Sequence, residues 1–133
     1  MTAVSRYFGA GSELTQPFWD GCTDGRLLVQ ECSRCATRWF TPEAVCVECL
    51  SPDWSWAESP GTGEVYSVTV VHRAPSDAFV GPYAIGVVEL DDGWSFLANL
   101  NGQAPEGWQV GDRVVVTFSS FDGRAVPSFR KAH

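Results

Sequence analysis

Two cysteine pairs, Cys32-Ser-Arg-Cys35 and Cys46-Val-Glu-Cys49, stand ten residues apart and decide how the rest of the chain is interpreted. Each C-x-x-C pair can place two thiolates on one turn. Two such turns facing each other supply the four sulfur ligands that zinc prefers, at about 2.3 Å. The spacing therefore predicts a zinc ribbon whose ligands are Cys32, Cys35, Cys46 and Cys49. Because four thiolates leave no position for water or substrate, we expect the metal to be structural.

The cysteine count also fits a second interpretation. Five cysteines in 133 residues would suit a secreted protein with two disulfides and one free thiol. The sequence shows neither a signal peptide nor a run of about 18 apolar residues that could span a bilayer. We therefore expect a soluble, cytoplasmic protein whose paired cysteines bind metal. The fifth cysteine, Cys22, has no histidine beside it in sequence, and we expect an inert, partly buried thiol rather than a nucleophile.

Composition and charge exclude some classes of partner. Hydrophobic residues make up 44% of the chain and charged residues 19%, so most of it can bury a core. The formal net charge is −7, and four thiolates around one Zn²⁺ would add about two negative charges. Affinity for nucleic acid depends on Lys and Arg that neutralise phosphates, and the nine such residues here form no long run. We therefore predict neither nucleic acid nor a membrane as partner.

The N-terminal part divides into an arm, a helical segment and the ribbon. Residues 1–14 show no steady hydrophobic period and indicate a flexible arm. Pro17 suits the first turn of a helix, and Phe18 with Trp19 supplies an apolar anchor, so we expect one or two helical turns that end near Gly25. The predicted domains are the arm and helical segment at 1–25, the zinc ribbon at 26–58, and a β-domain at 59–133.

The β-domain is predicted to be an OB-fold. Residues 52–62 contain two prolines and a glycine, which indicates a boundary between the ribbon and the rest. Beyond it, β-branched and alternating residues predict five strands, at 63–73, 83–90, 94–99, 113–121 and 126–129. An interruption between the third and fourth strands is typical of a small OB barrel, which closes its own edges. The predicted fold is therefore mainly β, with a short N-terminal helical segment, a rubredoxin-like ribbon and a five-stranded barrel.

Two details of the strands can be predicted as well. A period of two in the first barrel strand places Tyr66 and Val68 on one face, and Val65 and Ser67 on the other. Gly86, inside the second strand, indicates a bulge or a tight bend in that strand.

Candidate ligand-binding residues lie at one mouth of the barrel. His72 and Arg73 end the first barrel strand beside the loop 74–81, and barrel mouths commonly bind ligands. In the alternative interpretation, His72 is one more residue of the sheet and forms a local hydrogen bond. The six Trp and eight Phe residues could stack on nucleic-acid bases, or could fill cores and a protein interface; the acidic charge favours the second.

No catalytic constellation is apparent in the sequence. Asp91, Asp92 and Asp122 precede glycines and are typical turn residues rather than paired catalytic carboxylates. No glycine-rich loop opens a helix as a phosphate-binding loop requires, and no Ser-His-Asp or Cys-His arrangement can be argued from spacing. We expect no catalysis by this chain alone.

The order of several short motifs resembles that of a known family. The motifs are Pro17-Phe18-Trp19 with Gly21, Gly25-Arg26-Leu27-Leu28, the two cysteine pairs with Pro42 between them, Gly61-x-Gly63-x-Val65-Tyr66-Ser67, Val71-His72-Arg73, Pro82-Tyr83 and Val110-Gly111. From about residue 15 to residue 130 the chain resembles the acyl-CoA-associated family that joins a rubredoxin-like zinc ribbon to an OB-fold. Its single motifs are moderately specific, whereas their order and spacing together are highly specific.

This resemblance implies a role as a partner subunit. Members of the family typically associate with thiolase-like enzymes, including acyltransferases, thiolases and steroid side-chain aldolases, or are fused to or paired with hot-dog hydratases. By this likeness the chain is a non-catalytic accessory subunit whose ribbon and barrel help to form the partner's acyl-CoA entrance, with acyl-CoA shared between the subunits. Symmetric thiolase dimers imply a two-plus-two assembly. We expect an aromatic docking surface formed by Phe18, Trp19, Trp39 and Phe40.

Two alternative functions use the same parts. A free-standing acyl-CoA binder would receive the CoA phosphates on Arg73, Arg130 or Lys131, with His72 nearby. A module for single-stranded nucleic acid would use the barrel and ribbon as a stacking surface.

The cysteine turns depart from the family pattern at three positions. The family usually has glycine after the second cysteine of each pair and proline after the third cysteine, whereas Ala36, Leu50 and Val47 stand there in this chain. Glycine eases a left-handed turn and a close approach of the backbone to sulfur. Zinc affinity is therefore the property that these three residues affect most directly.

Overall fold

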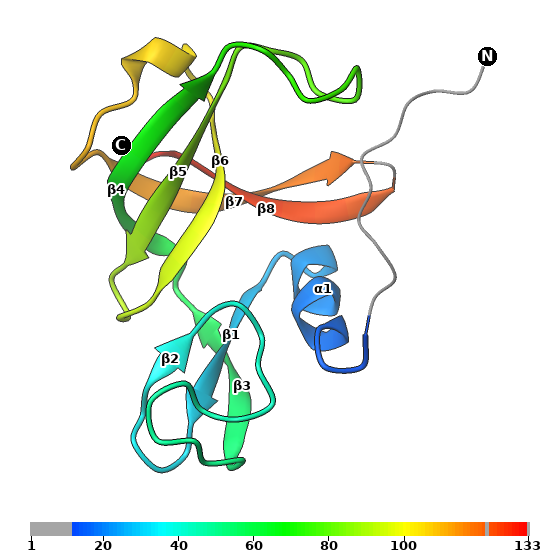
Figure 1. The fold of residues 1–133 in the computed structure, drawn as a ribbon, viewed down its shortest axis with the longest axis vertical. Helices are drawn as coiled ribbons and strands as arrows, with labels where there is room; N and C mark the ends of the chain where they lie inside the picture. The colour runs from blue at the N-terminus through cyan, green and yellow to red at the C-terminus, as the bar shows by residue number, and fades with distance from the viewer. Residues whose placement is uncertain (1–11, 122, 133) are drawn as a thin grey trace.

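The computed structural model describes residues 12–121 and 123–132. Most of the predicted arm, residues 1–11, and Asp122 of the predicted last turn lie outside the described residues. The described chain is mainly β, with one short helix, a ribbon carrying the four cysteines, and a closed barrel of five strands. The predicted fold class is therefore confirmed. Figure 1 shows the barrel above the ribbon, with helix α1 beside the joint between them.

Helix α1 (Gln16–Thr23) follows the turn signals predicted for it. Pro17 lies in its first turn, and the chain leaves the helix at Asp24, whose amide donates back to Asp20 and Gly21. The buried face carries Phe18, Gly21 and Cys22. No helix among the described residues is long and apolar enough to cross a bilayer.

The ribbon contains a three-stranded antiparallel sheet in the order β2-β1-β3. Its strands are β1 (Leu27–Cys32), β2 (Arg38–Trp39) and β3 (Trp54–Ser59). Strand β3 lies within the segment predicted to be a boundary, and it pairs with β1 along its whole length, from Leu27 opposite Ser59 to Cys32 opposite Trp54. The sequence did not predict this strand. The prolines that indicated a boundary, Pro52 and Pro60, stand just outside β3, where proline removes no hydrogen bond from the sheet.

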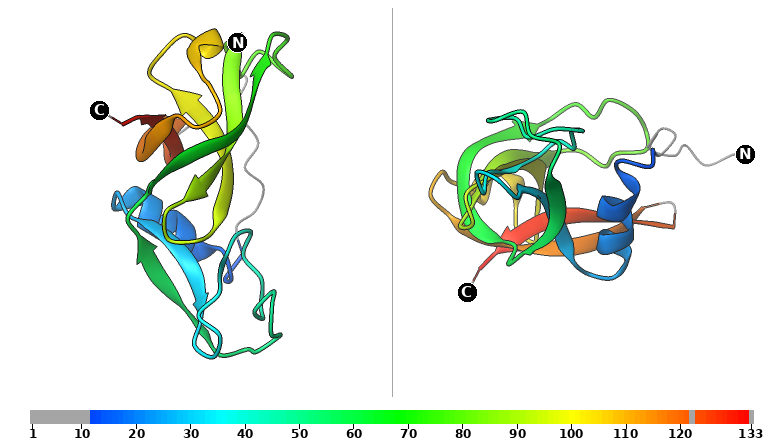
Figure 2. Two further views of the ribbon diagram at one scale, coloured as in Figure 1. Left: turned by 90° about the vertical axis from the view of Figure 1, so that its left-hand side faces the viewer. Right: turned by 90° about the horizontal axis from the view of Figure 1, so that it is seen from below.

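The barrel has the strand order of an OB-fold. Strands run β4-β5-β6-β8-β7 and β7 closes onto β4; β6 and β8 are parallel, and the other pairs are antiparallel. The view from below in Figure 2 shows the rounded wall of this barrel. The bounds are β4 (Thr62–Val71), β5 (Tyr83–Leu90), β6 (Ser95–Asn101), the short 3-10 helix η1 (Pro105–Gly107), β7 (Arg113–Phe121) and β8 (Arg124–Lys131).

A bulge in β4 changes which side chains face the core. The register with β5 shifts between Val65 and Ser67, so Val65 is fully buried while Tyr66 is 60% exposed, and Val68 packs against the core. The predicted common face of Tyr66 and Val68 is therefore wrong, because the extra residue reverses the alternation. Gly86, where the irregularity was predicted, serves close packing instead: a Cβ there would lie 2.5 Å from the carbonyl oxygen of Ser67.

One hydrophobic core joins the helix, the ribbon and the barrel. Phe18 of α1 and Leu27 and Val29 of β1 belong to the same buried cluster as Phe96 and Phe129 of the barrel. A second, smaller cluster contains two metal-site cysteines and Trp39, with Trp54 packed against it. The upper part of the ribbon therefore has no core separate from that of the barrel.

A hydrogen-bond network around Asp92 also connects ribbon and barrel. Arg38 of β2 donates from Nη1 to Asp92 Oδ2 over 2.7 Å, and Trp94 donates from Nε1 to the same oxygen over 2.9 Å. Ser59, at the end of β3, donates to the other carboxylate oxygen over 3.0 Å. Arg38 also binds Glu31 at 2.7 Å. Asp92 lies in the β5–β6 turn as predicted, and in addition it binds both parts of the molecule.

Candidate metal centre and docking surface

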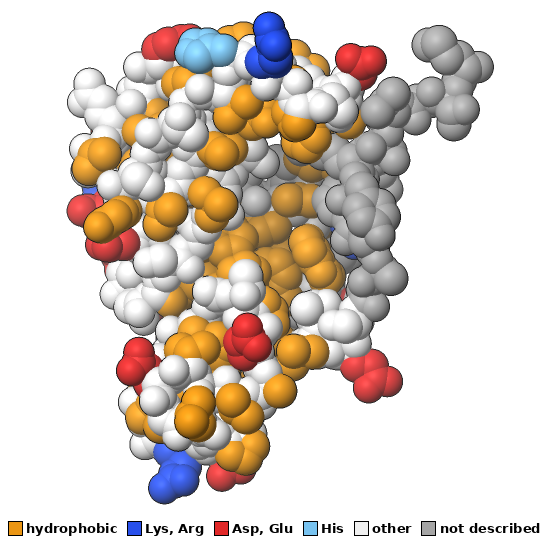
Figure 3. Space-filling view, viewed as in Figure 1, with side chains coloured by type: hydrophobic (Ala, Val, Ile, Leu, Met, Phe, Trp, Pro, Cys, Tyr) orange, Lys and Arg blue, Asp and Glu red, His pale blue; other side chains and the backbone are white. Residues whose placement is uncertain are grey.

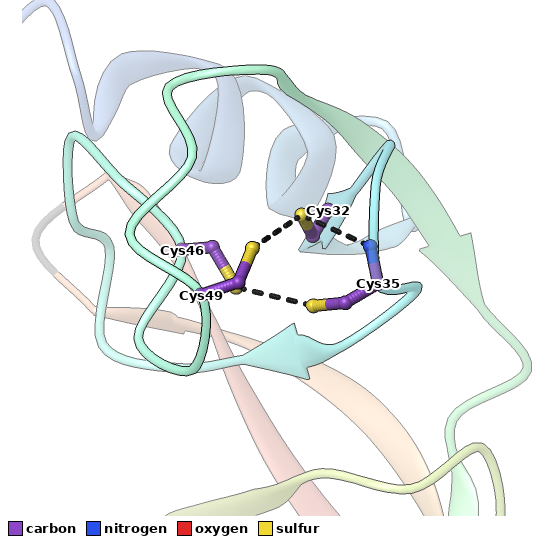
Figure 4. Close-up of side chains that lie close together, drawn as sticks. All are labelled: Cys32, Cys35, Cys46 and Cys49. Carbon is purple, nitrogen blue, oxygen red and sulfur yellow. Dashed lines mark hydrogen bonds between the residues drawn. The ribbon is translucent and has the colours of Figure 1, made fainter.

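The four predicted ligands meet at one point of the ribbon. Their sulfur atoms all lie within 4.8 Å of one another, and the shortest separations are 3.6 Å, between Cys32 and Cys49 and between Cys35 and Cys46. A tetrahedral zinc site with Zn–S bonds of about 2.3 Å needs sulfur atoms about 3.8 Å apart. Figure 4 shows the four side chains pointing toward one another from two facing loops. The cysteines are therefore placed to bind a tetrahedral metal ion.

The two cysteine turns share one backbone pattern. In the first turn the amide of Cys32 donates to Thr37 O over 2.9 Å, and that of Ala36 donates to Cys32 O over 3.1 Å. In the second, Cys46 donates to Ser51 O over 2.9 Å and Leu50 to Cys46 O over 3.0 Å. In each turn an amide two residues after the first cysteine points at its sulfur, at 3.4 Å. Such amides stabilise a thiolate.

Ala36 and Leu50 occupy equivalent positions in these turns. Both have φ of 63°, in the left-handed region that glycine enters most easily. An ordinary residue in this region carries a strain of about 1–2 kcal/mol. The structure therefore explains the family preference for glycine at both positions, and shows that this chain adopts the same turn without it.

In the absence of metal, the pKa values of Cys32, Cys35 and Cys49 are shifted in different directions. Hydrogen bonds to the side chain and backbone of Thr37 lower the pKa of Cys35 to about 6, and the amide of Cys35 contributes most to lowering the pKa of Cys32. A backbone bond involving Ser51 lowers the pKa of Cys49, but desolvation and the neighbouring thiols outweigh it and raise that pKa to about 11. Metal binding at neutral pH therefore releases a proton from Cys49.

Cys22 lies apart from the metal centre. It is 1% exposed on the buried face of α1, and burial raises the pKa of its thiol to about 12. It therefore stays protonated at neutral pH and behaves as a small apolar side chain.

An apolar cavity of about 310 Å³ opens where helix, ribbon and barrel meet. Phe18 and Trp19 line it from α1, Phe40 from the position directly after β2, Phe96 and Leu97 from β6, and Pro127 from β8. Figure 3 shows this hollow as a recessed apolar surface between the ribbon and the barrel. The aromatic rings support one another, with the centroids of Phe40 and Phe96 4.7 Å apart and those of Phe18 and Phe40 5.0 Å apart.

Three of the four predicted interface residues meet at this cavity. Phe18, Trp19 and Phe40 line it, and the guanidinium of Arg124 lies 5.6 Å from the ring of Trp19. Trp39 does not reach it: it is 5% exposed and packs beside Cys32 and Cys46 in the second core cluster. Trp39, the last residue of β2, thus packs with the cysteines, whereas Phe40, the residue directly after the strand, lines the cavity.

Sequence reasoning missed one exposed residue of the cavity, Leu97. Leu97 is 64% exposed, although the residues before and after it pack toward the core. The signal available in the sequence was a leucine at a solvent-facing position of an alternating strand.

The three predicted ligand-binding residues lie on the barrel, away from this cavity. His72 and Arg73 directly follow β4, and neither side chain forms a hydrogen bond or ion pair with another residue in the described part of the chain. Arg130 is exposed on β8, opposite Asn101 at the end of β6, and it donates to the carbonyl of Lys131 over 3.3 Å. A role for these residues in binding ligand stays a prediction.

Two protein-family models match the chain. Residues 19–55 match the model described as the ChsH2 rubredoxin-like zinc ribbon domain, and residues 56–119 match the ChsH2 C-terminal OB-fold domain. The chain belongs to the ChsH2 family. The resemblance inferred from the order of motifs is thereby confirmed, and it includes both cysteine pairs.

Curated relatives include hydratase subunits and scaffold proteins. The chain is 38% identical over 117 residues to a probable enoyl-CoA hydratase alpha subunit of Thermomonospora curvata, covering 86% of this chain and 37% of that protein. It is 30% identical over 112 residues to the 3-oxo-4,17-pregnadiene-20-carboxyl-CoA hydratase alpha subunit of Mycobacterium tuberculosis, at 84% and 36% coverage. It is also 30% identical over 94 residues to a DUF35 domain-containing scaffold protein of Methanocaldococcus jannaschii, at 69% and 67%. The chain thus spans little more than a third of each hydratase subunit.

Two solved structures share the fold of this chain. A chain of the Ltp2-ChsH2(DUF35) aldolase superimposes with a TM-score of 0.86 at 35% identity, covering 94% of this chain and 99% of that chain. A DUF35-family protein of unknown function from Sulfolobus solfataricus superimposes with a TM-score of 0.65 at 15% identity, covering 90% of this chain and 86% of that chain. The second likeness supports the shared architecture alone.

Proposed function

We propose that this ChsH2-family chain is a non-catalytic accessory subunit of an acyl-CoA-dependent, thiolase-like enzyme. The observation that carries the proposal is the likeness, over 94% of this chain and 99% of the other, to a chain of the Ltp2-ChsH2(DUF35) aldolase. The relatives named as scaffold proteins support a binding role in place of a catalytic one. Chemistry would then belong to the partner, and this chain would supply a surface that the partner needs.

The apolar cavity is the docking surface in this proposal. Trp19 and Phe40 are partly buried and Leu97 is largely exposed, so the isolated chain leaves apolar area in contact with water. Aromatic residues in a concave site are typical of the residues that dominate binding energy at protein interfaces. Apolar side chains of the partner would fill the 310 Å³ hollow. The ribbon and the barrel, which form its two sides, would flank the partner's acyl-CoA entrance.

The metal would act at a distance from this surface. When bound, zinc joins the two cysteine turns and neutralises part of their charge. Trp39 packs against that site and the next residue, Phe40, lines the cavity. The fixed position of β2 therefore holds one wall of the docking surface in place.

A hydratase is the second candidate for the partner. It is favoured by the 38% identity over 117 residues to a probable enoyl-CoA hydratase alpha subunit. The matched residues make up 86% of this chain and 37% of that relative, so the relative contains most of this module within a longer protein. Both candidates use acyl-CoA substrates and need the same accessory role.

Co-expression tests the proposal. The tagged chain is produced with an Ltp2-type subunit of the same genome, and separately with a hot-dog hydratase subunit, and each purified sample is weighed by native mass spectrometry. We expect a stable complex with the Ltp2-type subunit at two copies of each chain. Recovery of this chain alone in both samples would overturn the accessory role. Recovery of a complex only in the hydratase sample would assign the accessory role to the hydratase, the second candidate partner.

A matched pair of variants locates the docking surface. Leu97→Ser removes an exposed apolar side chain at the cavity and should weaken the complex about tenfold. Val110→Ser removes a similarly exposed side chain, 67% against 64%, outside the cavity, and should leave the affinity unchanged. Equal affinity of both variants would show that the partner binds elsewhere.

A further inference from the structure

The second cysteine turn carries a small apolar surface of its own. Val45, Val47 and Leu50 are 38%, 50% and 71% exposed, and in the sequence they flank Cys46 and Cys49. We call these three side chains the ribbon tip. Figure 3 shows apolar side chains at the surface of the lower end of the molecule, where Figure 1 places the ribbon. None of the three lines the docking cavity.

Leu50 is unfavourable for the isolated fold in two ways. Its φ of 63° places a residue with a branched side chain in the left-handed region, and Leu50 is 71% exposed to water. Glycine would relieve the strain and remove the exposed apolar surface at once. A strained residue that also gives up burial is typical of a functional position. Ala36, at the equivalent position of the first turn, has the same φ but no such side chain.

The loop that carries the tip is held in place. Gln30 is fully buried, and its side-chain amide binds the backbone of Glu43 twice, donating to O over 2.7 Å and accepting from N over 2.8 Å. The indole of Trp54 donates to Ala44 O over 2.8 Å. The tip side chains therefore start from an ordered backbone, which lowers the entropy lost on binding.

The charges around the tip indicate what covers it. Glu43, Glu48 and Asp53 are exposed nearby, and Arg34 is the exposed cation of the facing turn. A tetrathiolate zinc site would add about two negative charges. A second copy of this chain, with a net charge of −7, would be repelled, as would nucleic acid or an anionic membrane. An apolar groove flanked by Lys or Arg on another protein is complementary.

We propose that the ribbon tip is a second docking element, which inserts Leu50 and Val47 into an apolar groove with a basic rim on the same partner subunit. The inference rests on the proposed function, because the partner is the subunit that binds at the cavity. It adds a contact made by exposed apolar residues of the second cysteine turn, none of which lines the cavity.

Leu50→Gly separates this proposal from a structural role for the residue. Relief of the left-handed strain should raise the melting temperature, while loss of the side chain should weaken binding of the Ltp2-type subunit about tenfold. Val47→Ser, at an ordinary backbone position, should weaken binding about threefold. Ala36→Gly is the matched control: it should also raise the melting temperature, with affinity unchanged. Zinc content and melting temperature are measured for each variant.

The acidic side chains near the ribbon tip are tested by a separate measurement, the association rate constant. Glu48→Gln should lower the association rate constant about threefold at low salt, and the difference should vanish at high salt. Affinities of Leu50→Gly and Val47→Ser equal to that of the natural chain would overturn the second docking element and leave the proposed function standing. If the natural chain binds neither subunit, both proposals fall. Self-association that Leu50→Gly abolishes would assign the tip to a second copy and overturn the inference.

Discussion

Ala36 shows how a single backbone angle affects the stability of the first cysteine turn. Its φ of 63° lets its amide donate to Cys32 O and closes the first cysteine turn, but the Cβ strains the backbone. We predict that Ala36→Gly raises the free energy of unfolding by about 1 kcal/mol, because glycine enters this region without penalty. Thermal unfolding of the metal-bound protein, followed by circular dichroism, measures the gain as a few degrees.

Ala44→Gly is the control for this prediction. Ala44 is also exposed in the ribbon, and its φ is not positive. Glycine there gives the unfolded chain more freedom and relieves nothing, so stability should fall by about 0.5–1 kcal/mol. If both variants lose stability, the left-handed conformation of Ala36 carries no strain.

Individual residues differ in how far their roles could be predicted from the sequence. The four cysteines were predictable because two pairs at fixed spacing already contain the geometry of the site. Gln30 was not, since an amide within Leu-Leu-Val-Gln-Glu-Cys resembles a solvent-facing residue of a strand. It is fully buried because the loop that brings Glu43 against it has free backbone groups to bind, and the position of that loop is not encoded in any local pattern.

At the scale of elements, the barrel was more predictable than the ribbon. Strands β5 and β7 have the predicted bounds because β-branched residues run between clear turn signals. Strand β3 was missed because the prolines that flank it indicated a boundary; pairing with β1 along six positions stabilises it. The bulge in β4 was missed because an extra residue in one strand is defined only relative to its neighbour.

The Asp92 network predicts how strongly ribbon and barrel are joined. Asp92→Ala removes the acceptor for Arg38, Ser59 and Trp94, where the Arg38 side chain is only 20% exposed. Donors left without a partner in such a place should lower the free energy of unfolding by about 2–3 kcal/mol. Urea unfolding monitored by tryptophan fluorescence gives the value.

The adjacent residue supplies the control. Asp91 pairs with Arg113, and both side chains are about half exposed, at 46% and 51%. Asp91→Ala should therefore change stability by less than about 1 kcal/mol, because water and salt screen an exposed pair. Equal losses for the two alanine variants would mean that Asp92 acts only as a turn residue.

On the scale of the whole molecule, the shared core makes one unfolding unit of two sheets. Phe18, Leu27 and Val29 contribute to the same cluster as Phe96 and Phe129, and few buried residues belong to the ribbon alone. A ribbon of this size has too little apolar area to fold by itself, so it depends both on the barrel and on the metal. We therefore expect a single cooperative transition for the metal-bound protein.

Metal removal should weaken the entire molecule and not the ribbon alone. Metal analysis of the natural chain is expected to give one zinc per chain, and chelation should lower the melting temperature measured on barrel signals as well as on the ribbon. Cys35→Ser tests the ligand set at an exposed position and should lose most of the zinc, because serine replaces a thiolate that zinc strongly prefers. Cys22→Ala, which removes a thiol outside the site, should keep one zinc per chain. Barrel signals that stay unchanged after chelation would separate the two sheets energetically. The aromatic docking cavity would then persist without the metal, and zinc would matter only for the ribbon tip.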